Sequence, residues 1–398
     1  MFSFFSKNDT QTHFLIECGS GSAACALIVT DADRKPKIVY QKRIPFETQE
    51  NKDHRGTVSS LTKTLAQLLK EVRSTGFEKL TRLDAPRKLS DITVTFTAPW
   101  YAVRTPHISQ DYKEERVITD DFLTGLKEQE KQKMVVNGAS LFSDEFQNES
   151  PIIVESIILQ SKLNGYTTEN PVNKRTTSFE AQLYVSAVQQ SVLDKIESLI
   201  GETFDISNVS YHTLPLITFF ALRDLFTTTS NALFVDISGE ATTISAVHDG
   251  SIRDVLSFTK GTHGLVHHVA DTLHIGTKAA ASALAMHDLS VLNPSTHSNI
   301  NEYIQKYTHE WFTDFSNTVD TIKEKHHVGN RVVIVAGVGL TDYFHDQLTK
   351  QNAGSENAKH QVIELKAGQL ARRLRFPKTF QPDSFIALEA IVLADNEL

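Results

Sequence analysis

The stretch 235–250 contains residues whose types and spacing could bind an anion. An apolar run ends at Asp236, the small residues Ser238 and Gly239 follow, and a second run rich in β-branched residues comes after them. This pattern predicts a β-hairpin whose tip offers backbone N–H groups and hydroxyls to an anion such as phosphate. The same pattern is also typical of an ordinary buried hairpin with a glycine turn, and alone it does not separate the two interpretations.

Two further segments repeat this order of apolar strand and small-residue turn. Residues 14–29 carry Glu17 at the end of an apolar run, followed by a turn of small residues at 19–22. Residues 331–340 are apolar up to Ala336 and then contain two glycines. We expect a buried strand in each segment, with a turn at which a ligand can approach the backbone closely.

The composition is that of a soluble globular protein. The 398 residues are 40% hydrophobic and 22% charged, and the formal net charge of -8 leaves no basic stripe for nucleic-acid phosphates. The only two cysteines, Cys18 and Cys25, lie in one apolar run, which fits buried thiols in a reducing compartment. No apolar run is long enough to predict a membrane span.

Periodicity predicts an alternation of strands and helices around the three motifs. Residues 109–150 differ from the rest because polar and charged side chains dominate there, which suggests part of an inserted subdomain. The expected strands are 37–44, 91–103, 151–163, 178–188 and 251–258. The expected helices are 58–72, 119–133 (capped by Asp120 or Asp121), 191–200, 211–226, 265–273, 277–286, 301–325 and 385–394.

The three turns, in this order and spacing, resemble those of the actin-like ATPase superfamily. Within it the chain is most similar to the branch that contains the cell-division protein FtsA and the pilus-assembly protein PilM. The resemblance spans roughly residues 12–395 and includes the insert. It implies an α/β, ribonuclease H-like fold of two lobes with an inserted α/β subdomain. The implied divisions are a first lobe at 1–104 and 201–230, an insert at 105–200, and a second lobe at 231–398 with a helical subdomain at about 265–330.

The resemblance also implies an ATP and Mg²⁺ site between the lobes. Glu17 and Asp236 would hold Mg²⁺ through water. The implied nucleotide-binding residues are Glu17, Gly19, Ser20, Gly21, Ser22, Asp236, Ser238, Gly239, Thr242, Thr243, Gly261, Ala336, Gly337 and Gly339.

Several positions depart from the pattern of the branch. Ser22 stands where many relatives have a lysine, which removes a charge-assisted phosphate contact of about 1.5–3 kcal/mol. Thr243 stands where a second acid is usual, and Ser238 replaces a glycine. Helix 277–286 lacks the glutamate and lysine that line the nucleotide in relatives. These departures predict a weakened ATP site with little hydrolysis, and no catalytic residue can be named.

The expected function is therefore that of a cytoplasmic scaffold of the FtsA and PilM type. Its partner would be the cytoplasmic peptide of a membrane protein or a cytoskeletal filament, in cell division or pilus assembly. No autonomous membrane anchor is visible, so recruitment to the inner face of the membrane would go through that partner. Self-association is a property of the superfamily and stays open. Pro99, Trp100 and Tyr101 are the expected docking surface, unless they are a strand end packed on the core.

Two alternatives belong to other classes. The same hairpins occur in small-molecule kinases and active ATPases of the superfamily, which need a catalytic acid over the substrate, and only Asp236 is a candidate. Metal binding is suggested by the pairs His267-His268 and His326-His327. Neighbouring histidines point to different faces of a helix, so solvated or partly buried histidines are the simpler interpretation.

Overall fold

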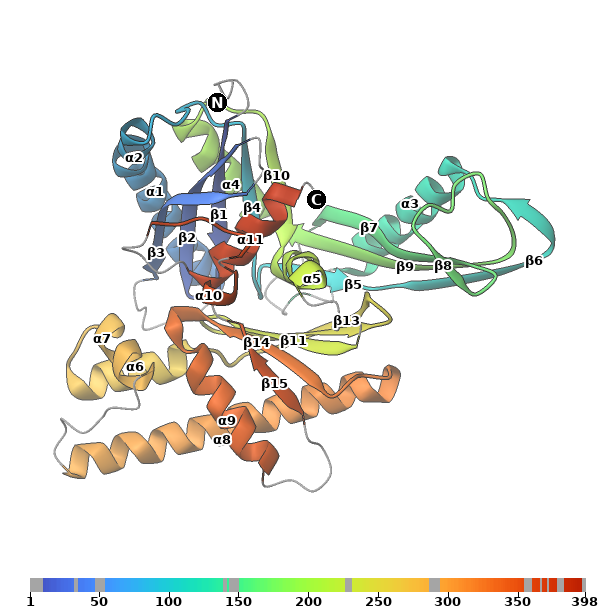
Figure 1. The fold of residues 1–398 in the computed structure, drawn as a ribbon. Helices are drawn as coiled ribbons and strands as arrows, with labels where there is room; N and C mark the ends of the chain where they lie inside the picture. The colour runs from blue at the N-terminus through green and yellow to red at the C-terminus, as the bar shows by residue number, and fades with distance from the viewer. Residues whose placement is uncertain are drawn as a thin grey trace, which may run out of the picture.

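Three five-stranded sheets organise the described part of the chain (Figure 1). The computed structural model describes residues 10–31, 35–46, 54–138, 142, 150–225, 231–285, 294–353, 360–365, 367–370, 372–377 and 383–395. Among these residues, no helix is both long and apolar enough to cross a membrane.

The first sheet has the strand order β10-β4-β1-β2-β3. Strand β1 pairs antiparallel with β2 and parallel with β4, and β4 pairs parallel with β10. Helix α1 is followed by a five-residue π-helical turn, η2, and then by the short helix α2, which leads toward β4. The bounds are β1 (Gln11–Cys18), β2 (Ser22–Thr30), β3 (Lys37–Pro45), β4 (Asp91–Phe96), β10 (Val209–Thr213), α1 (His54–Glu71), η2 (Val72–Gly76) and α2 (Phe77–Arg82).

Both faces of the first sheet are covered because successive side chains point to opposite sides. Phe14, Ile16 and Cys18 pack with α1 and with α4 (Gln190–Thr203), whereas Leu15 and Ala24 pack with α5 (Leu214–Leu225) and α11 (Ser384–Asp395). We call the first sheet with α1, α2 and α4 the first lobe.

The second sheet has the order β13-β12-β11-β14-β15. One of its faces is covered by helices α6 to α9, and the other joins the same core as α5 and α11, so these two helices lie between the sheets (Figure 1). We call the second sheet with α6 to α9 the second lobe. The bounds are β11 (Ala232–Ile237), β12 (Thr242–His248), β13 (Ser251–Phe258), β14 (Arg331–Ala336), β15 (Gln361–Glu364), α6 (His263–Leu273), α7 (Thr277–Ala285), α8 (Pro294–Lys325) and α9 (Thr341–Ala353).

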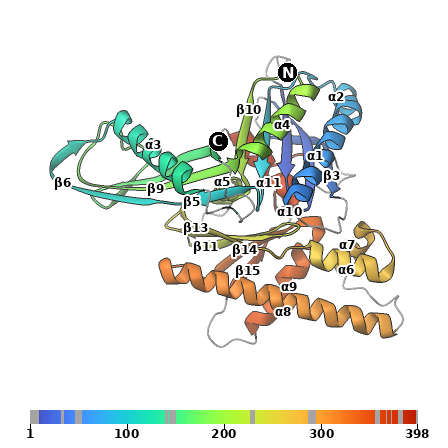
Figure 2. The ribbon, with the colours of Figure 1, turned by 180° about the vertical axis from the view of Figure 1, so that it is seen from behind.

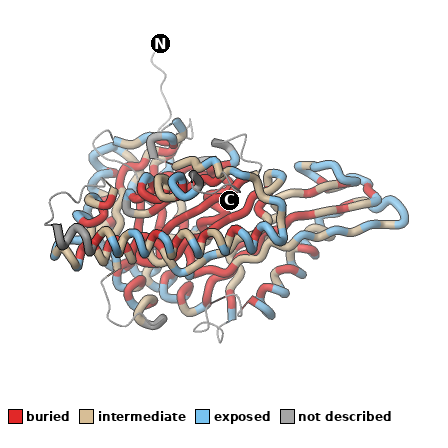
Figure 3. The backbone as a smooth tube through the Cα atoms, turned by 90° about the horizontal axis from the view of Figure 1, so that it is seen from below, coloured by how far each residue is buried: buried red, intermediate tan, exposed pale blue. Residues whose placement is uncertain are grey.

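The third sheet projects to one side of both lobes (Figure 2). Its centre is the long hairpin of β7 and β9, with α3 packed along it. Figure 3 shows buried residues concentrated in the body of the molecule, while the far end of this sheet is mostly exposed. The bounds are β5 (Tyr101–Arg104), β6 (His107–Val117), α3 (Asp120–Asn137), β7 (Pro151–Leu163), β8 (Tyr166–Thr168) and β9 (Arg175–Gln189).

Four predicted elements differ from the structure. The single strand expected at 91–103 is divided into β4 and β5 by a turn that contains the cis peptide Ala98-Pro99. Residues 107–117, for which no strand is predicted, form β6, an edge strand whose largely exposed side chains explain its polarity. The helix expected from 211 starts at Leu214, after β10. Helix α3 is capped by Thr119, which accepts from the Phe122 N–H, rather than by either aspartate.

Candidate functional site

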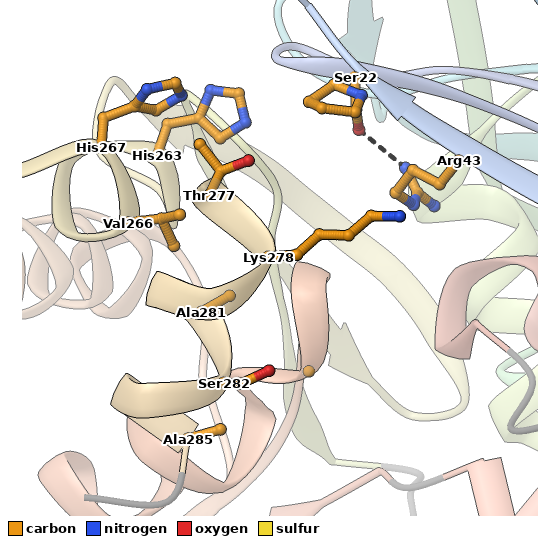
Figure 4. Close-up of a pocket in the computed structure, with 12 residues that line it drawn as sticks. Ser22, Arg43, His263, Val266, His267, Thr277, Lys278, Ala281, Ser282 and Ala285 are labelled. Carbon is orange, nitrogen blue, oxygen red and sulfur yellow. Dashed lines mark hydrogen bonds between the residues drawn. The ribbon is translucent and has the colours of Figure 1, made fainter. Parts of the chain in front are cut away.

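A cavity of about 430 Å³ lies between the two lobes (Figure 4). The first lobe contributes residues from β2 and β3, and the second lobe contributes α6, α7 and the turn after β14. The lining residues are Ser22, Arg43, Pro45, His263, Val266, His267, Thr277, Lys278, Ala281, Ser282, Ala285 and Gly339.

The tip of the β1–β2 hairpin reaches the edge of this cavity. The Gly19 N–H donates to the Ser22 carbonyl over 3.0 Å, which closes the turn. A side chain on Gly19 would place its Cβ 2.5 Å from that carbonyl oxygen, and one on Gly21 would overlap the His263 ring at 1.9 Å. Both positions therefore need glycine because neighbouring atoms approach the backbone closely.

The tip of the β11–β12 hairpin is tied to the start of α6. The Thr262 N–H donates to the Ser238 carbonyl over 2.8 Å, and the His263 N–H donates to the Gly239 carbonyl over 2.9 Å. A Cβ on Gly261 would lie 2.3 Å from the Ser238 oxygen, so only glycine fits there. The first turn of α6 therefore moves with this hairpin.

The two tips contact each other directly. The Ser20 and Ser238 hydroxyls are 3.2 Å apart, and the Glu240 N–H donates to Ser20 Oγ over 2.8 Å. His263, whose ring lies over Gly21, is 3.2 Å from the Glu240 carboxylate. Because protein groups bridge the tips, a phosphate can enter between them only if the two hairpins separate.

Arg43 of β3 lies beneath the first tip and uses all of its N–H donors within the protein. Its Nη1 donates to Glu17 Oε1 over 2.9 Å and to Ser22 Oγ over 3.0 Å. Its Nη2 donates to Glu17 Oε2 and, over 3.0 Å, to Asp383 Oδ1, and its Nε donates to Asp383 Oδ2 over 2.7 Å. Since a guanidinium has five N–H donors, Arg43 has none left for a phosphate in this arrangement. The Ser22 hydroxyl, which accepts from Arg43, keeps its own proton for a ligand in the cavity.

The pKa values of the acids around Arg43 are shifted in different directions. Burial raises the pKa of Glu17, an effect that Arg43 opposes, and it raises the pKa of the nearby Glu389 further because Glu17 adds like charge. Burial also acts to raise the pKa of Asp383, but Arg43 and the N–H groups of Phe385 and Ile386 outweigh it and lower that pKa. The group is thus a buried cluster with one cation and three acids.

Asp236 is buried at the end of β11, and only 5% of it is exposed. Its Oδ1 has no hydrogen-bond partner among the residues that the structure describes. Burial, and secondarily the charge of Glu17, raises its pKa from 3.8 to about 8. A carboxyl group with that pKa is mostly protonated at pH 7, so in this arrangement Asp236 is a poor ligand for Mg²⁺ and a poor base.

Lys278 of α7 places a second cation at the cavity. Figure 4 shows its side chain extending from the second lobe toward Arg43 of the first lobe. The expectation that residues 277–286 lack a lysine facing the ligand is therefore wrong. Because Arg43 is already paired with Glu17 and Asp383, Lys278 is the cation of the lining that could contact an anionic ligand.

The predicted site residues fall into three groups. Ser22 and Gly339 line the cavity. The residues of the tips, which contact each other or α6, are Gly19, Ser20, Gly21, Ser238, Gly239 and Gly261.

The remaining residues do not line the cavity. Thr242 donates to the Lys260 carbonyl and accepts from Trp311, and Thr243 bonds Ser257. The other residues of this group are Glu17 and Asp236, which are buried, Ala336, which ends β14, and Gly337, which begins the turn after it.

Sequence reasoning missed Arg43, His263, Lys278 and Asp383. Arg43 and Asp383 are 340 residues apart, and no local pattern marks such a pair. His263 follows the predicted turn at Gly261 and could have been found as the residue that opens α6. Lys278 could have been found as the cation in the first turn of the helix predicted at 277–286.

The docking surface expected at Pro99, Trp100 and Tyr101 is wrong for two of the three residues. Trp100 is completely buried, and its indole N–H donates to the Gly19 carbonyl over 2.7 Å. Tyr101 is 8% exposed and lies 3.4 Å from the Thr243 hydroxyl. Their alternative interpretation, a strand end packed on the core, describes them: Trp100 bonds the tip of the first hairpin, and Tyr101, the first residue of β5, reaches β12.

The histidine pairs do not form metal sites among the described residues, where no group of three or more His, Cys, Asp or Glu side chains gathers. His268 stacks on Tyr303 with 3.4 Å between ring centroids, and His326 lies 3.7 Å from Asp254. These contacts are ordinary packing and surface pairing.

Comparison with known proteins gives similarity in structure alone. No family profile matches the sequence, and no curated protein matches it. Among solved structures, a PilM-PilN type IV pilus biogenesis complex aligns over 96% of this chain and 98% of that chain, with a TM-score of 0.60 and 13% identity. A protein of unknown function with an actin-like ATPase fold, from Bacteroides thetaiotaomicron, aligns over 99% of both chains with a TM-score of 0.44 and 10% identity.

The chain has the actin-like ATPase fold. The cavity lies between the lobes, beside the β1–β2 hairpin tip, the first turn of α6 and the turn after β14.

Proposed function

We propose that this protein is an actin-like scaffold that takes up a nucleotide between its lobes, hydrolyses it little, and uses the closed state to bind a protein partner. The observation that carries the proposal is the state of the two motif acids. Asp236 is buried with a pKa of about 8, and Glu17 is engaged by Arg43. An ATPase of this fold would need at least one ionised acid near the γ-phosphate to hold Mg²⁺ or orient water.

Nucleotide binding itself is supported by the cavity. Its volume of about 430 Å³ is in the range of small-ligand sites, and its lining combines apolar residues of α7 with Lys278 and the hydroxyls of Ser22 and Thr277. The Gly339 turn lies at the same cavity, as expected for the part that holds the adenosine. Phosphates would lie toward Lys278, because the other cation of the lining, Arg43, is already paired with Glu17 and Asp383.

A protein partner is proposed by analogy with the solved complex, whose PilM is bound to PilN. Following the same analogy, the partner would be the cytoplasmic peptide of a membrane protein, or a cytoskeletal filament, and this chain would act at the inner face of the membrane in pilus assembly or cell division. Opening and closing of the hairpin tips would couple nucleotide binding to binding of this partner.

The direct test of nucleotide binding is a calorimetric titration with Mg·ATP, comparing the wild type with Lys278→Ala. We expect binding by the wild type and an affinity about tenfold lower in the variant, because a charge-assisted phosphate contact is worth roughly 1.5–3 kcal/mol. Lys195→Ala, which changes an exposed lysine of α4, is the matched control and should bind as the wild type does. Absence of binding by the wild type, or equal binding by Lys278→Ala, would argue against the proposed site.

The alternative of a small-molecule kinase is tested in the same samples. ADP release that depends on an added sugar or carboxylic acid would favour a kinase, and it should disappear in Asp236→Asn if that residue is the base.

A further inference from the structure

A second concave site lies in the first lobe, at the end of the sheet opposite the cavity between the lobes. Its volume is about 730 Å³, and its walls are η2, α2, the segment that leads into β4 and the segment that leads into β10. In the register of the sheet, His13 pairs with Asp91, the first residue of β4. The hairpin tip at Gly19 is six residues further along β1, which at about 3.3 Å per residue is roughly 20 Å away. We call this site the basic groove.

Three cations surround the basic groove, and one acid, Asp205, opposes them. The three cations are Arg73, Arg87 and Lys88. Among the described residues, none of the three forms an ion pair with a carboxylate. The lining therefore carries an excess of positive charge, although the net charge of the whole chain is -8. Such an excess raises the local concentration of anionic ligands and attracts carboxylates.

The groove has an aromatic floor. Phe77 and Phe204 lie with ring centroids 6.0 Å apart, and Phe204 also contacts Phe14 of β1 at 5.3 Å. The Arg87 guanidinium lies over the Phe77 ring at 5.9 Å, so that cation and floor are adjacent. Leu89 and Ile206 complete the apolar part of the lining.

The walls are held by hydrogen bonds between the segments. Arg73 Nη1 donates to the Thr203 carbonyl over 2.6 Å, and the Ile92 N–H donates to the Asn208 carbonyl over 2.9 Å. The Ser90 N–H donates to the Thr12 carbonyl over 2.8 Å. The groove is therefore fixed to the ends of β1 and β4 and is formed before any partner arrives, which lowers the entropic cost of binding.

We propose that the basic groove binds an acidic peptide segment of a partner protein, with an aromatic or aliphatic side chain over Phe77 and Phe204 and carboxylates at Arg87, Lys88 and Arg73. An apolar floor with a charged rim is the arrangement of a protein-recognition site. A small anion would gain little here, because contacts to exposed cations are weak one at a time. A peptide gains from several of them together with the apolar contact. None of the lining residues belongs to the third sheet or to the cavity between the lobes, so this site is separate from the proposed nucleotide site.

The test uses the full chain and an array of heptapeptides in which the number of acidic residues and the central residue (Phe, Leu or Ala) are varied. An all-lysine heptapeptide with central Phe is the negative control. We expect binding of the chain to the peptides to increase with the number of acidic residues and to decrease as the salt concentration rises. Peptides with Phe or Leu at the centre should bind, and those with Ala should not. The best peptide is then titrated by fluorescence anisotropy.

The decisive comparison is between Arg87→Glu/Lys88→Glu and Arg82→Glu, an exposed arginine of α2 outside the groove. The double variant should weaken the best peptide at least about tenfold, while Arg82→Glu stays within about twofold of the wild type. Mg·ATP binding, measured in parallel, should be unchanged in both. The proposal is overturned if no acidic peptide exceeds the all-lysine control, or if the double variant binds as the wild type does.

Discussion

Arg43 joins three parts of the chain that are distant in sequence: the β1–β2 hairpin, β3 and the start of α11. It does so through paired hydrogen bonds to Glu17 and Asp383. A buried ion pair contributes little when it is complete, but removing one partner leaves an uncompensated buried charge. Arg43 therefore holds the β1–β2 hairpin in place beside the cavity between the lobes more than it adds to the net free energy of unfolding.

Arg43→Met should accordingly destabilise the protein by about 3–5 kcal/mol, because Asp383 and Glu17 lose their cation. Urea unfolding followed by circular dichroism measures this change. The double variant Arg43→Met/Glu17→Gln should recover part of the loss, since one buried acid is then neutral. Arg82→Met, at an exposed pair, should change the free energy of unfolding by less than about 0.5 kcal/mol. An Arg43→Met variant as stable as Arg82→Met would refute this role.

Asp236 should make stability depend on pH. Its pKa is about 8 in the folded protein, against 3.8 as its ordinary value. Between pH 3.8 and pH 8 the folded state holds a proton on Asp236 that the unfolded state has lost. The contribution of Asp236 to the free energy of unfolding therefore falls as pH rises, by at most about 1.4 kcal/mol per pH unit. Below pH 4 the contribution is fully present, and above pH 8 it is lost.

Asp236→Asn isolates this contribution because the amide does not titrate. Unfolding free energies of the wild type and variant should be similar near pH 4, and the variant should become progressively more stable than the wild type up to pH 8. Parallel curves for the two proteins from pH 4 to pH 8 would mean that Asp236 is not protonated when folded.

Glu155 of β7 connects the third sheet to the first lobe. Its carboxylate accepts from the Thr213 N–H over 3.1 Å, from the Thr213 hydroxyl over 2.6 Å and from the Ser186 hydroxyl. His212 lies 3.3 Å away. The joint between β7, β9 and β10 is thus a buried polar network, and networks of this kind hold elements in one arrangement only if every member is satisfied.

Glu155→Gln should loosen this joint because one carboxylate oxygen is replaced by an NH₂ group that faces other donors. We expect a loss of about 1–3 kcal/mol and faster hydrogen exchange at the Thr213 amide. Hydrogen exchange read by mass spectrometry measures the effect locally. Glu169→Gln, at an exposed position beyond β8, should leave exchange unchanged. Unchanged protection of Thr213 in Glu155→Gln would show that the network does not hold the joint.

Elements with a strong local signal could be predicted from the sequence. The apolar strands β1, β11 and β14 and their small-residue turns were predicted because burial on both faces gives continuous apolar runs. Strand β6 could not be found this way, because its partner β9 lies more than 50 residues further along the chain and its own side chains are exposed. The same reasoning applies to the site: the glycines were predicted from the turns, whereas Arg43 and Asp383 meet only in three dimensions.

The two lobes meet at the hairpin tips, beside the cavity between them. Ser20, Ser238 and Glu240 link the lobes, with His263 lying over Gly21. A nucleotide that enters between the tips must exchange these contacts for its own, so binding and lobe movement are coupled. Because neither Glu17 nor Asp236 is poised to ligate Mg²⁺, the movement is expected to follow binding rather than hydrolysis.

The most direct test of this account is a single-turnover measurement of phosphate release from Mg·ATP, with protein in excess over nucleotide. The account predicts that ATP binds and stays intact over many minutes, and that the wild type and Asp236→Asn give the same slow release. Rapid phosphate release by the wild type that is abolished in Asp236→Asn would contradict the account, because it would make Asp236 a working catalytic acid in an active ATPase.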